Sequence, residues 1–302
     1  MKQRIGFTLI EMLVVVMIIT MLAGLTLSAL GSARNAAAAS RTRATIEKIN
    51  RVVMKHYASY QYRKVDIGDT SGMNKQQVAR EKLNALRIII RQEMPDRAGD
   101  FDLRTRGQTT MPAFTQMYYA KTRTSRDPET GAANSTNMAA ELLYMQVMAD
   151  TVGAGMFSEG EVGDTDKDGL PEFIDGWGRP IRYILWPAGF FRTDNCESDL
   201  QATTVPTDAK FVHDPFDTAN LEPGAPALYP LIYSAGPDGI FDINRGTTEG
   251  NEANTFKYQT PLNPMTKDGD GRYIGQPWND TDGNNRVLHH FDNITNHTLL
   301  SN

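Results

Sequence analysis

One long apolar run at the N-terminus constrains this chain more than any other feature. Residues 7–30 contain a single charged side chain, that of Glu11, and they follow a short leader, residues 1–6, charged only at Lys2 and Arg4. At ~1.5 Å per residue a helix over this run is about 36 Å long, enough to cross a ~30 Å hydrocarbon core. The basic leader predicts a cytoplasmic N-terminus with the rest of the chain across the membrane. No other stretch approaches this length, so we expect one transmembrane helix.

The position of Glu11 inside this run indicates a function for its side chain. An unpaired carboxylate in hydrocarbon costs about a few kcal/mol unless it reaches the interface. A glutamate that only extends to the nearby interface is the alternative. The whole run could also be a cleaved secretory signal ending at Gly31-Ser32-Ala33. Signal cores are usually ~7–15 residues long, however, which is shorter than this run.

The residues around this glutamate carry a family resemblance. The segment Gly6-Phe7-Thr8-Leu9-Ile10-Glu11 resembles the class III signal of type IV pilins and type II secretion pseudopilins. The resemblance implies that prepilin peptidase cleaves between Gly6 and Phe7 and methylates the new amine of Phe7. It also implies that Glu11 of one subunit neutralises the Phe7 amine of a neighbour during filament assembly. Two buried charges that are each costly alone become tolerable as a pair.

The N-terminal helix is expected to continue past the membrane as an amphipathic segment over residues 31–67. Apolar residues recur there at spacings of three and four, and neither Pro nor Gly interrupts residues 32–67. Gly68 is the expected end, and Gly24 and Gly31 are expected to loosen the helix locally. A long spine helix packed on a globular head is also what the family resemblance implies.

The remaining sequence predicts a head with two parts, a helical part over residues 68–160 and a β-sheet with acidic loops over 161–302. Three further helices are expected from apolar residues at helical spacing, at 75–94, 112–120 and 135–150. Three strands are expected where β-prone runs stand between turn residues, at 181–186, 228–234 and 256–259. The predicted fold class is therefore α+β and pilin-like, with extra helices and a small antiparallel sheet bearing calcium-binding loops.

Charge is distributed unevenly along the chain. Residues 1–150 carry 21 Lys and Arg against 13 Asp and Glu, a net of +8, whereas residues 151–302 carry 10 against 23, a net of −13. The acidic half argues against a nucleic-acid partner and favours cations. Cys196 is the only cysteine, which excludes an intrachain disulfide and a cysteine-based zinc site.

A 12-residue segment in the acidic half, residues 164–175, predicts a metal site. Its carboxylates occupy positions 1, 3, 5, 9 and 12, and glycine occupies position 6. This is the spacing of an EF-hand-like calcium loop, in which the carbonyl at position 7 is also a ligand. Pro171 and the lack of a clear entering helix favour a free-standing loop; a solvated acidic turn is the alternative. The predicted ligands are Asp164, Asp166, Asp168, the carbonyl of Leu170, Glu172 and Asp175.

The next segment, residues 175–183, resembles the Asp-Pro-Trp-Gly-Asn-Pro-x-x-Tyr stretch of major pseudopilins. Gly176 and Arg179 depart from that pattern, while four residues keep it: Trp177, Gly178, Pro180 and Tyr183. The implied role is structural, a turn that feeds a strand and packs Trp177 on the spine helix.

Residues 233–242 resemble the following pseudopilin element, a strand that runs into a calcium-binding loop. The resemblance implies Asp238 and Asp242 as ligands, closed by a second acidic cluster shortly afterwards. The best match for that cluster is Asp292, roughly fifty residues further on, which makes residues 243–291 an insertion. The insertion could supply the closing ligands instead, from Asp268, Asp270, Asp280, Asp282 or Asn284.

These features predict a non-enzymatic structural subunit of a type II secretion pseudopilus, closest in pattern to the major pseudopilin. The sequence contains no P-loop, no G-x-S-x-G and no His-Glu-x-x-His motif. The implied partners are copies of itself, other pseudopilins, prepilin peptidase and the inner-membrane secretion platform, and the implied cofactor is calcium. The expected location is the bacterial inner membrane with a periplasmic head. A type IV pilus pilin with exposed adhesive loops, and a membrane-anchored calcium-dependent enzyme or binding module, are the alternatives.

Overall fold

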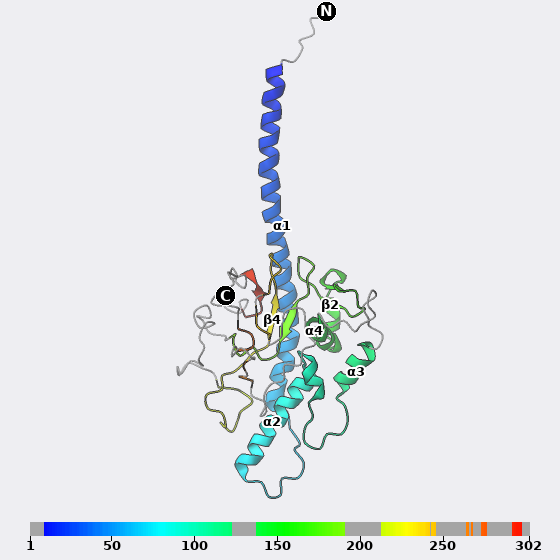
Figure 1. Cartoon of the computed structure of the whole chain (residues 1–302), viewed down its shortest axis with the longest axis vertical. Helices are drawn as coiled ribbons and strands as arrows, with labels where there is room; N and C mark the ends of the chain where they lie inside the picture. Colours follow the sequence, from blue (N-terminus) through cyan, green and yellow to red (C-terminus); the bar gives the residue numbers. More distant parts are fainter. Residues whose placement is uncertain are drawn as a thin grey trace, which may run out of the picture.

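A single helix, α1 (Leu9–Ser59), runs the length of the molecule and projects far beyond its head (Figure 1). The structure, a computed structural model, describes residues 9–122, 137–190, 213–241, 243–245, 264–265, 267, 273–276 and 292–297. The predicted α+β class is confirmed, because the head around the second half of α1 combines helices with small antiparallel sheets.

The two halves of α1 differ in what surrounds them. Large apolar side chains between Leu9 and Leu30 are exposed, whereas Ile46, Ile49 and Tyr57 are almost completely buried in the head. The first half is therefore apolar all round, and the second half buries one stripe. Among the described residues this is the one helix long and apolar enough to cross a membrane.

The spine helix is continuous through both of its glycines but ends earlier than expected. A short 3₁₀ turn, η1 (Tyr60–Tyr62), follows α1, so the helix does not reach Gly68. Arg63 takes an extended conformation, with φ −75° and ψ 124°. Its guanidinium pairs with Glu93 of the next helix at 2.5 Å, which draws the chain away from the helix axis.

The second helix, α2 (Lys75–Glu93), lies where the apolar pattern placed it. Asn74 accepts a hydrogen bond from the Gln77 backbone N–H, and the Gln77 side chain accepts one from the Asn74 N–H, so a capping box begins the helix. Two arginines inside the helix, Arg87 and Arg91, are only 1% exposed and pair with carboxylates of the head.

The other expected helices form as well. They are α3 (Ala113–Thr122) and α4 (Met138–Ala149). The short 3₁₀ segment η2 (Ala98–Asp102) precedes α3, and two more, η3 (Gly153–Gly155) and η4 (Glu159–Glu161), follow α4. Most of α4 is buried, and it packs against α1 on one side and strands β2 and β3 on the other. Helix α4 therefore lies between the spine and the acidic part of the head.

Two small antiparallel sheets complete the head. Strands β1 (Val162–Gly163) and β2 (Glu172–Phe173) form a hairpin. Strands β3 (Arg182–Ile184), β4 (Leu231–Ser234) and β5 (Ile294–Thr295) form a sheet in that order, with β4 beside α1 (Figure 1). Strands β3 and β4 confirm two expected runs, whereas the expected strand at 256–259 lies outside the described residues.

The turn after the hairpin packs on α1 as the resemblance implied. Trp177 packs against the main core, and its indole N–H donates to the Asn35 side chain at 3.4 Å. The Gly176 N–H donates to Thr42 Oγ1 at 2.8 Å. A Cβ at position 176 would lie 2.2 Å from the carbonyl oxygen of Ala38, so α1 leaves room there only for glycine.

Candidate functional site

The predicted metal loop is the connection of the β1–β2 hairpin. The pair Gly163↔Glu172 closes it, and residues 164–171 form the loop. Asp164 accepts hydrogen bonds from the N–H groups of Asp168 and Gly169 at 3.1 and 3.0 Å. Gly169 has φ +93°, a conformation that favours glycine, which explains the glycine at the sixth position. Local hydrogen bonds therefore shape this loop.

Three aspartates of the loop converge. One carboxylate oxygen from each of Asp164, Asp166 and Asp168 lies within 4.8 Å of the others. Both oxygens of Asp166 are buried and accept no hydrogen bond among the described residues. Burial, and then the charges of Asp168 and Asp164, raise the pKa of Asp166 to about 6. The three oxygens form a cluster of negative charge that a cation would stabilise.

A second, more buried group of carboxylates shares Asp166 with the first. Oxygens of Glu141, Asp166 and Glu172 also lie within 4.8 Å of one another. Glu172 is fully buried; its Oε2 accepts from the Thr165 N–H at 3.1 Å, and its Oε1 accepts no hydrogen bond in the described part of the chain. Burial, with the charges of Asp166 and Asp164, raises the pKa of Glu172 to about 8, against the lowering effect of the Thr165 N–H.

Glu141 is the residue of this site that sequence reasoning missed. It stands in α4, fully buried beside Leu142 and Leu143. The available signal was an acidic side chain in the first turn of a short, otherwise uncharged helix, because such a group is rarely buried without a partner or a metal. Its position next to the hairpin depends on tertiary packing.

Asp175, the last residue of the predicted loop, joins neither described group of carboxylates. Its Oδ1 accepts from the N–H groups of Trp177 and Arg179, each at 2.9 Å, and its Oδ2 accepts from Ser234 Oγ at 2.7 Å. These bonds hold the turn after the hairpin against strand β4. The metal role of Asp175 stays a prediction, as does that of the Leu170 carbonyl.

In the second predicted calcium loop, the structure brings Asp238 and Asp292 together. Asp292 Oδ2 accepts from the Asp238 N–H at 3.4 Å, and a Cβ on Gly236 would lie 2.3 Å from the Asp292 carbonyl oxygen. The segment at Asp292 therefore lies against this loop, as the resemblance implied. Asp242 lies outside the described residues, as do the alternative ligands of the insertion, Asp268, Asp270, Asp280, Asp282 and Asn284. The metal role of the second loop stays a prediction.

Arg179, one of the two departures from the pseudopilin pattern, places its guanidinium on this second loop. Its Nη1 donates to the carbonyl oxygens of Gly236 at 2.8 Å and Pro237 at 3.4 Å. An arginine at this position thus provides a fixed positive charge where the pattern has asparagine.

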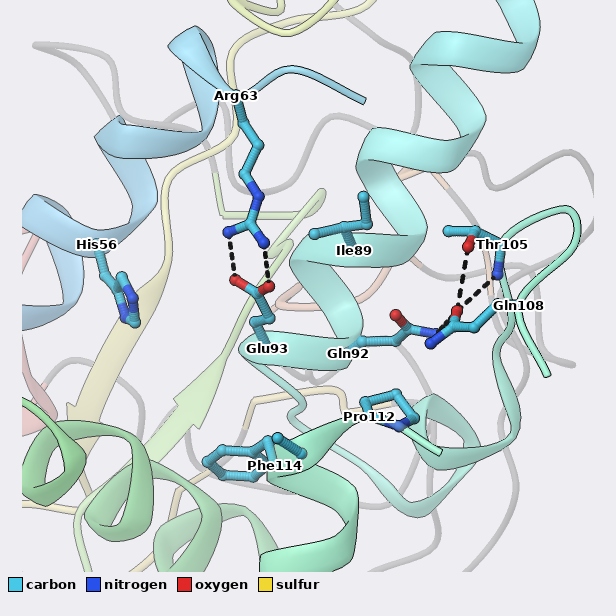
Figure 2. Close-up of a pocket in the computed structure, with 10 residues that line it drawn as sticks. His56, Arg63, Ile89, Gln92, Glu93, Thr105, Gln108, Pro112 and Phe114 are labelled. Carbon is cyan, nitrogen blue, oxygen red and sulfur yellow. Dashed lines mark hydrogen bonds and ion pairs between the residues drawn. The ribbon is translucent and has the colours of Figure 1, made fainter. Parts of the chain in front are cut away.

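A groove of about 520 Å³ runs between the end of α1, the end of α2 and the start of α3 (Figure 2). Polar side chains on its wall pair with one another. Arg63 pairs with Glu93 through Nη1 and Nη2, and Gln92 donates to Gln108 at 2.9 Å (Figure 2). These side chains hold the neighbouring segments together, so we interpret the groove as a packing boundary between helices.

The predicted assembly residue Glu11 stands at the end of α1 that is far from the head. Glu11 is exposed in the first turn of α1, whereas Gly6 and Phe7 lie outside the described residues. The first 27 residues match the family model described as the prokaryotic N-terminal methylation motif. No curated protein and no solved structure matches the chain.

The motif and the fold together define the class of protein. A methylation motif at the start of a long apolar helix, with an α+β head on the second half of that helix, characterises a pilin-like protein of the type IV pilin and pseudopilin class. Such proteins are processed and N-methylated by prepilin peptidase. They are generally non-enzymatic structural subunits that assemble into filaments. The apolar helix and the motif indicate anchoring in the inner membrane.

Proposed function

We propose that this protein is a subunit of a type II secretion pseudopilus. Prepilin peptidase cleaves it between Gly6 and Phe7 and methylates the Phe7 amine. The secretion platform then assembles it with copies of itself and with other pseudopilins, and the growing filament drives protein secretion. The observation that carries the proposal is the continuity of the methylation motif with α1, a helix that is exposed and apolar in one half and buried in the head in the other.

On this proposal, the exposed half of α1 occupies two environments in turn, first the membrane and then the filament. As a monomer it lies in the inner membrane, where an apolar surface is favourable. In a filament the same surface packs against helices of neighbouring subunits. Glu11 in the first turn then neutralises the Phe7 amine of a neighbour, since neither charge is tolerable alone in that apolar setting.

The assembly step is tested with Glu11→Ala. The variant chain is expected to insert in the membrane and to be absent from sheared or purified filaments. Asp102→Ala is the control, because Asp102 is an exposed carboxylate of the head, and it should be incorporated at the wild-type level. Equal incorporation of Glu11→Ala and wild type would overturn the assembly role.

A type IV pilus pilin would show the same motif and helix, so a separate experiment distinguishes the type II secretion system from the type IV pilus. On the pseudopilus proposal, filaments containing this chain disappear when the type II secretion platform is deleted. They persist when the type IV pilus platform is deleted. The reverse result would support a pilin with exposed adhesive loops.

We further propose calcium as the cofactor of the head. The outer carboxylates of the hairpin, Asp164, Asp166 and Asp168, offer the hard oxygen ligands that calcium prefers, with the Leu170 carbonyl as a further ligand. The loop of Asp238, Asp242 and Asp292 is the proposed second region. Outside the cytoplasm calcium reaches millimolar levels, so sites of modest affinity are occupied. Ligation only in the folded state stabilises the head by mass action.

A further inference from the structure

We infer that Glu141, Asp166 and Glu172 form a buried cation position beneath the outer aspartates, so that the hairpin holds two cations that share Asp166. The outer position is made by Asp164, Asp166 and Asp168. The inner one is made by one residue of α4, one of the loop and one of β2. This inference rests on the proposal that the hairpin binds calcium, and it adds a second ion and a ligand from another part of the chain.

The spacing of the oxygen atoms fits two ions. Calcium–oxygen distances are about 2.3–2.6 Å, so oxygens on opposite sides of one ion are about 5 Å apart. Each group of three has its oxygens within 4.8 Å of one another. Both oxygens of Asp166 are buried and accept no hydrogen bond from the described residues, so this carboxylate is able to ligate both ions.

Glu172 supplies an independent reason to place an ion in the inner position. Its side chain is fully buried, and its Oε1 accepts no hydrogen bond from the described residues. In the same part of the chain no Lys or Arg forms an ion pair with Glu172 or Asp166. Buried carboxylates normally pair, accept hydrogen bonds or coordinate metals.

The charges also balance better with two ions. The five carboxylates, Asp164, Asp166, Asp168, Glu141 and Glu172, carry a formal charge of −5, and two divalent cations supply +4. All donors are oxygens, which selects hard cations such as calcium over softer transition metals. An inner ion would tie the hairpin to α4, and α4 packs directly on the spine helix.

The experiment is a count of bound calcium on the full chain in detergent, by native mass spectrometry and calorimetric titration. The wild-type chain is expected to bind two ions at the hairpin. Their number is the difference between the calcium bound by the wild type and that bound by the double variant Asp164→Asn/Glu141→Gln. Glu141→Gln alone is expected to lose one and keep the outer ion. Asp164→Asn alone should lose one and keep the inner ion. Glu159→Gln, an exposed glutamate shortly before the loop, is the control and should keep both.

The outcomes separate the inner position from the calcium proposal itself. An unchanged count in Glu141→Gln, with one ion lost in Asp164→Asn, overturns the inner position and leaves the outer calcium site standing. A hairpin that binds no calcium overturns both. The variant Glu172→Gln separates the loss of an ion from a folding defect. Glutamine has nearly the same shape as glutamate, and its side-chain oxygen can still accept the hydrogen bond from the Thr165 N–H. This variant should bind one calcium ion fewer than the wild type, and in EGTA its unfolding temperature should equal or exceed that of the wild type. A lower unfolding temperature with an unchanged number of bound ions contradicts the inference.

Discussion

Lys48 Nζ lies 2.8 Å from Glu161 Oε1 and joins the spine helix to the turn from which the acidic hairpin begins. The same carboxylate accepts from Thr45 Oγ1 at 2.7 Å and from the N–H and hydroxyl of Ser158, each at 3.0 Å. Glu161 is only 6% exposed. One buried carboxylate therefore fixes the position of the hairpin relative to α1.

This pairing predicts a pH dependence of stability. Burial disfavours the ionised form of Glu161, but the hydrogen bonds from Lys48, Ser158 and Thr45 outweigh it and lower its pKa from 4.5 to about 2. Because the folded pKa is lowered, the contribution is present above the unfolded value and is lost as pH falls from about 5 to 2. It amounts to up to about 3 kcal/mol at ~1.4 kcal/mol per pKa unit.

Urea unfolding of the full chain between pH 2 and 7 checks this prediction. The difference in free energy of unfolding between wild type and Glu161→Gln should shrink as pH falls below 5. The exposed Glu159→Gln should follow the wild-type curve throughout. Parallel curves for wild type and Glu161→Gln would contradict the role given to Glu161.

Removal of calcium is expected to destabilise the head. A ligand at about 100 times its Kd stabilises the folded state by about 2.7 kcal/mol per site. Thermal unfolding in excess EGTA should therefore occur at a lower temperature than in millimolar calcium, and added calcium should restore it. The proposal that calcium orders the acidic loops fails if the melting curve is the same in both.

Gly176→Ala is expected to loosen the head from its spine. The new Cβ would collide with the Ala38 carbonyl of α1, which is backbone and cannot move aside as a side chain could. A loss of about 1–3 kcal/mol is typical for such overpacking. Gly155→Ala is the control, since a Cβ there meets no atom within 4 Å. Chemical denaturation of the two variants should differ by that amount, and equal stabilities would refute the close approach.

Arg87 of α2 is expected to be much more costly to remove than Arg80 of the same helix. It is 1% exposed and bonds Asp214 at 2.9 Å and Glu222 at 2.8 Å, so its loss leaves Asp214 buried without this cation. Breaking a buried ion pair costs about 3–5 kcal/mol. Arg80 makes only an exposed pair with Glu222 at 3.7 Å, so Arg80→Ala should cost about 1 kcal/mol or less. Similar losses for Arg80→Ala and Arg87→Ala in urea unfolding would contradict this account.

Local pattern accounts for much of this fold. The apolar run of α1, the stripe of α2 and the β-prone runs of β3 and β4 are periodic features that neighbouring residues define. The two-residue strands β1, β2 and β5 are too short to show such a signal, and β5 also depends on pairing with β4, which is distant in the sequence. The burial of Arg87 likewise depends on Asp214, far away in the sequence.

In the candidate metal site, too, some features follow from local spacing and others depend on tertiary packing. The spacing of Asp164, Asp166 and Asp168 was sufficient to predict their convergence. Spacing could not show that Asp175 also accepts a hydrogen bond from Ser234, because Ser234 lies on a strand that is distant in the sequence. Nor could it find Glu141, which approaches the hairpin only when α4 packs against β2.

The most direct test of the central claim is the intact mass and N-terminal sequence of the protein purified from its native membrane. The account predicts a chain that begins at Phe7 and carries one added methyl group on its N-terminal amine. A chain that begins at Met1, or after Ala33, would contradict prepilin processing. The long helix would then have to be explained as a plain membrane anchor or as a secretory signal.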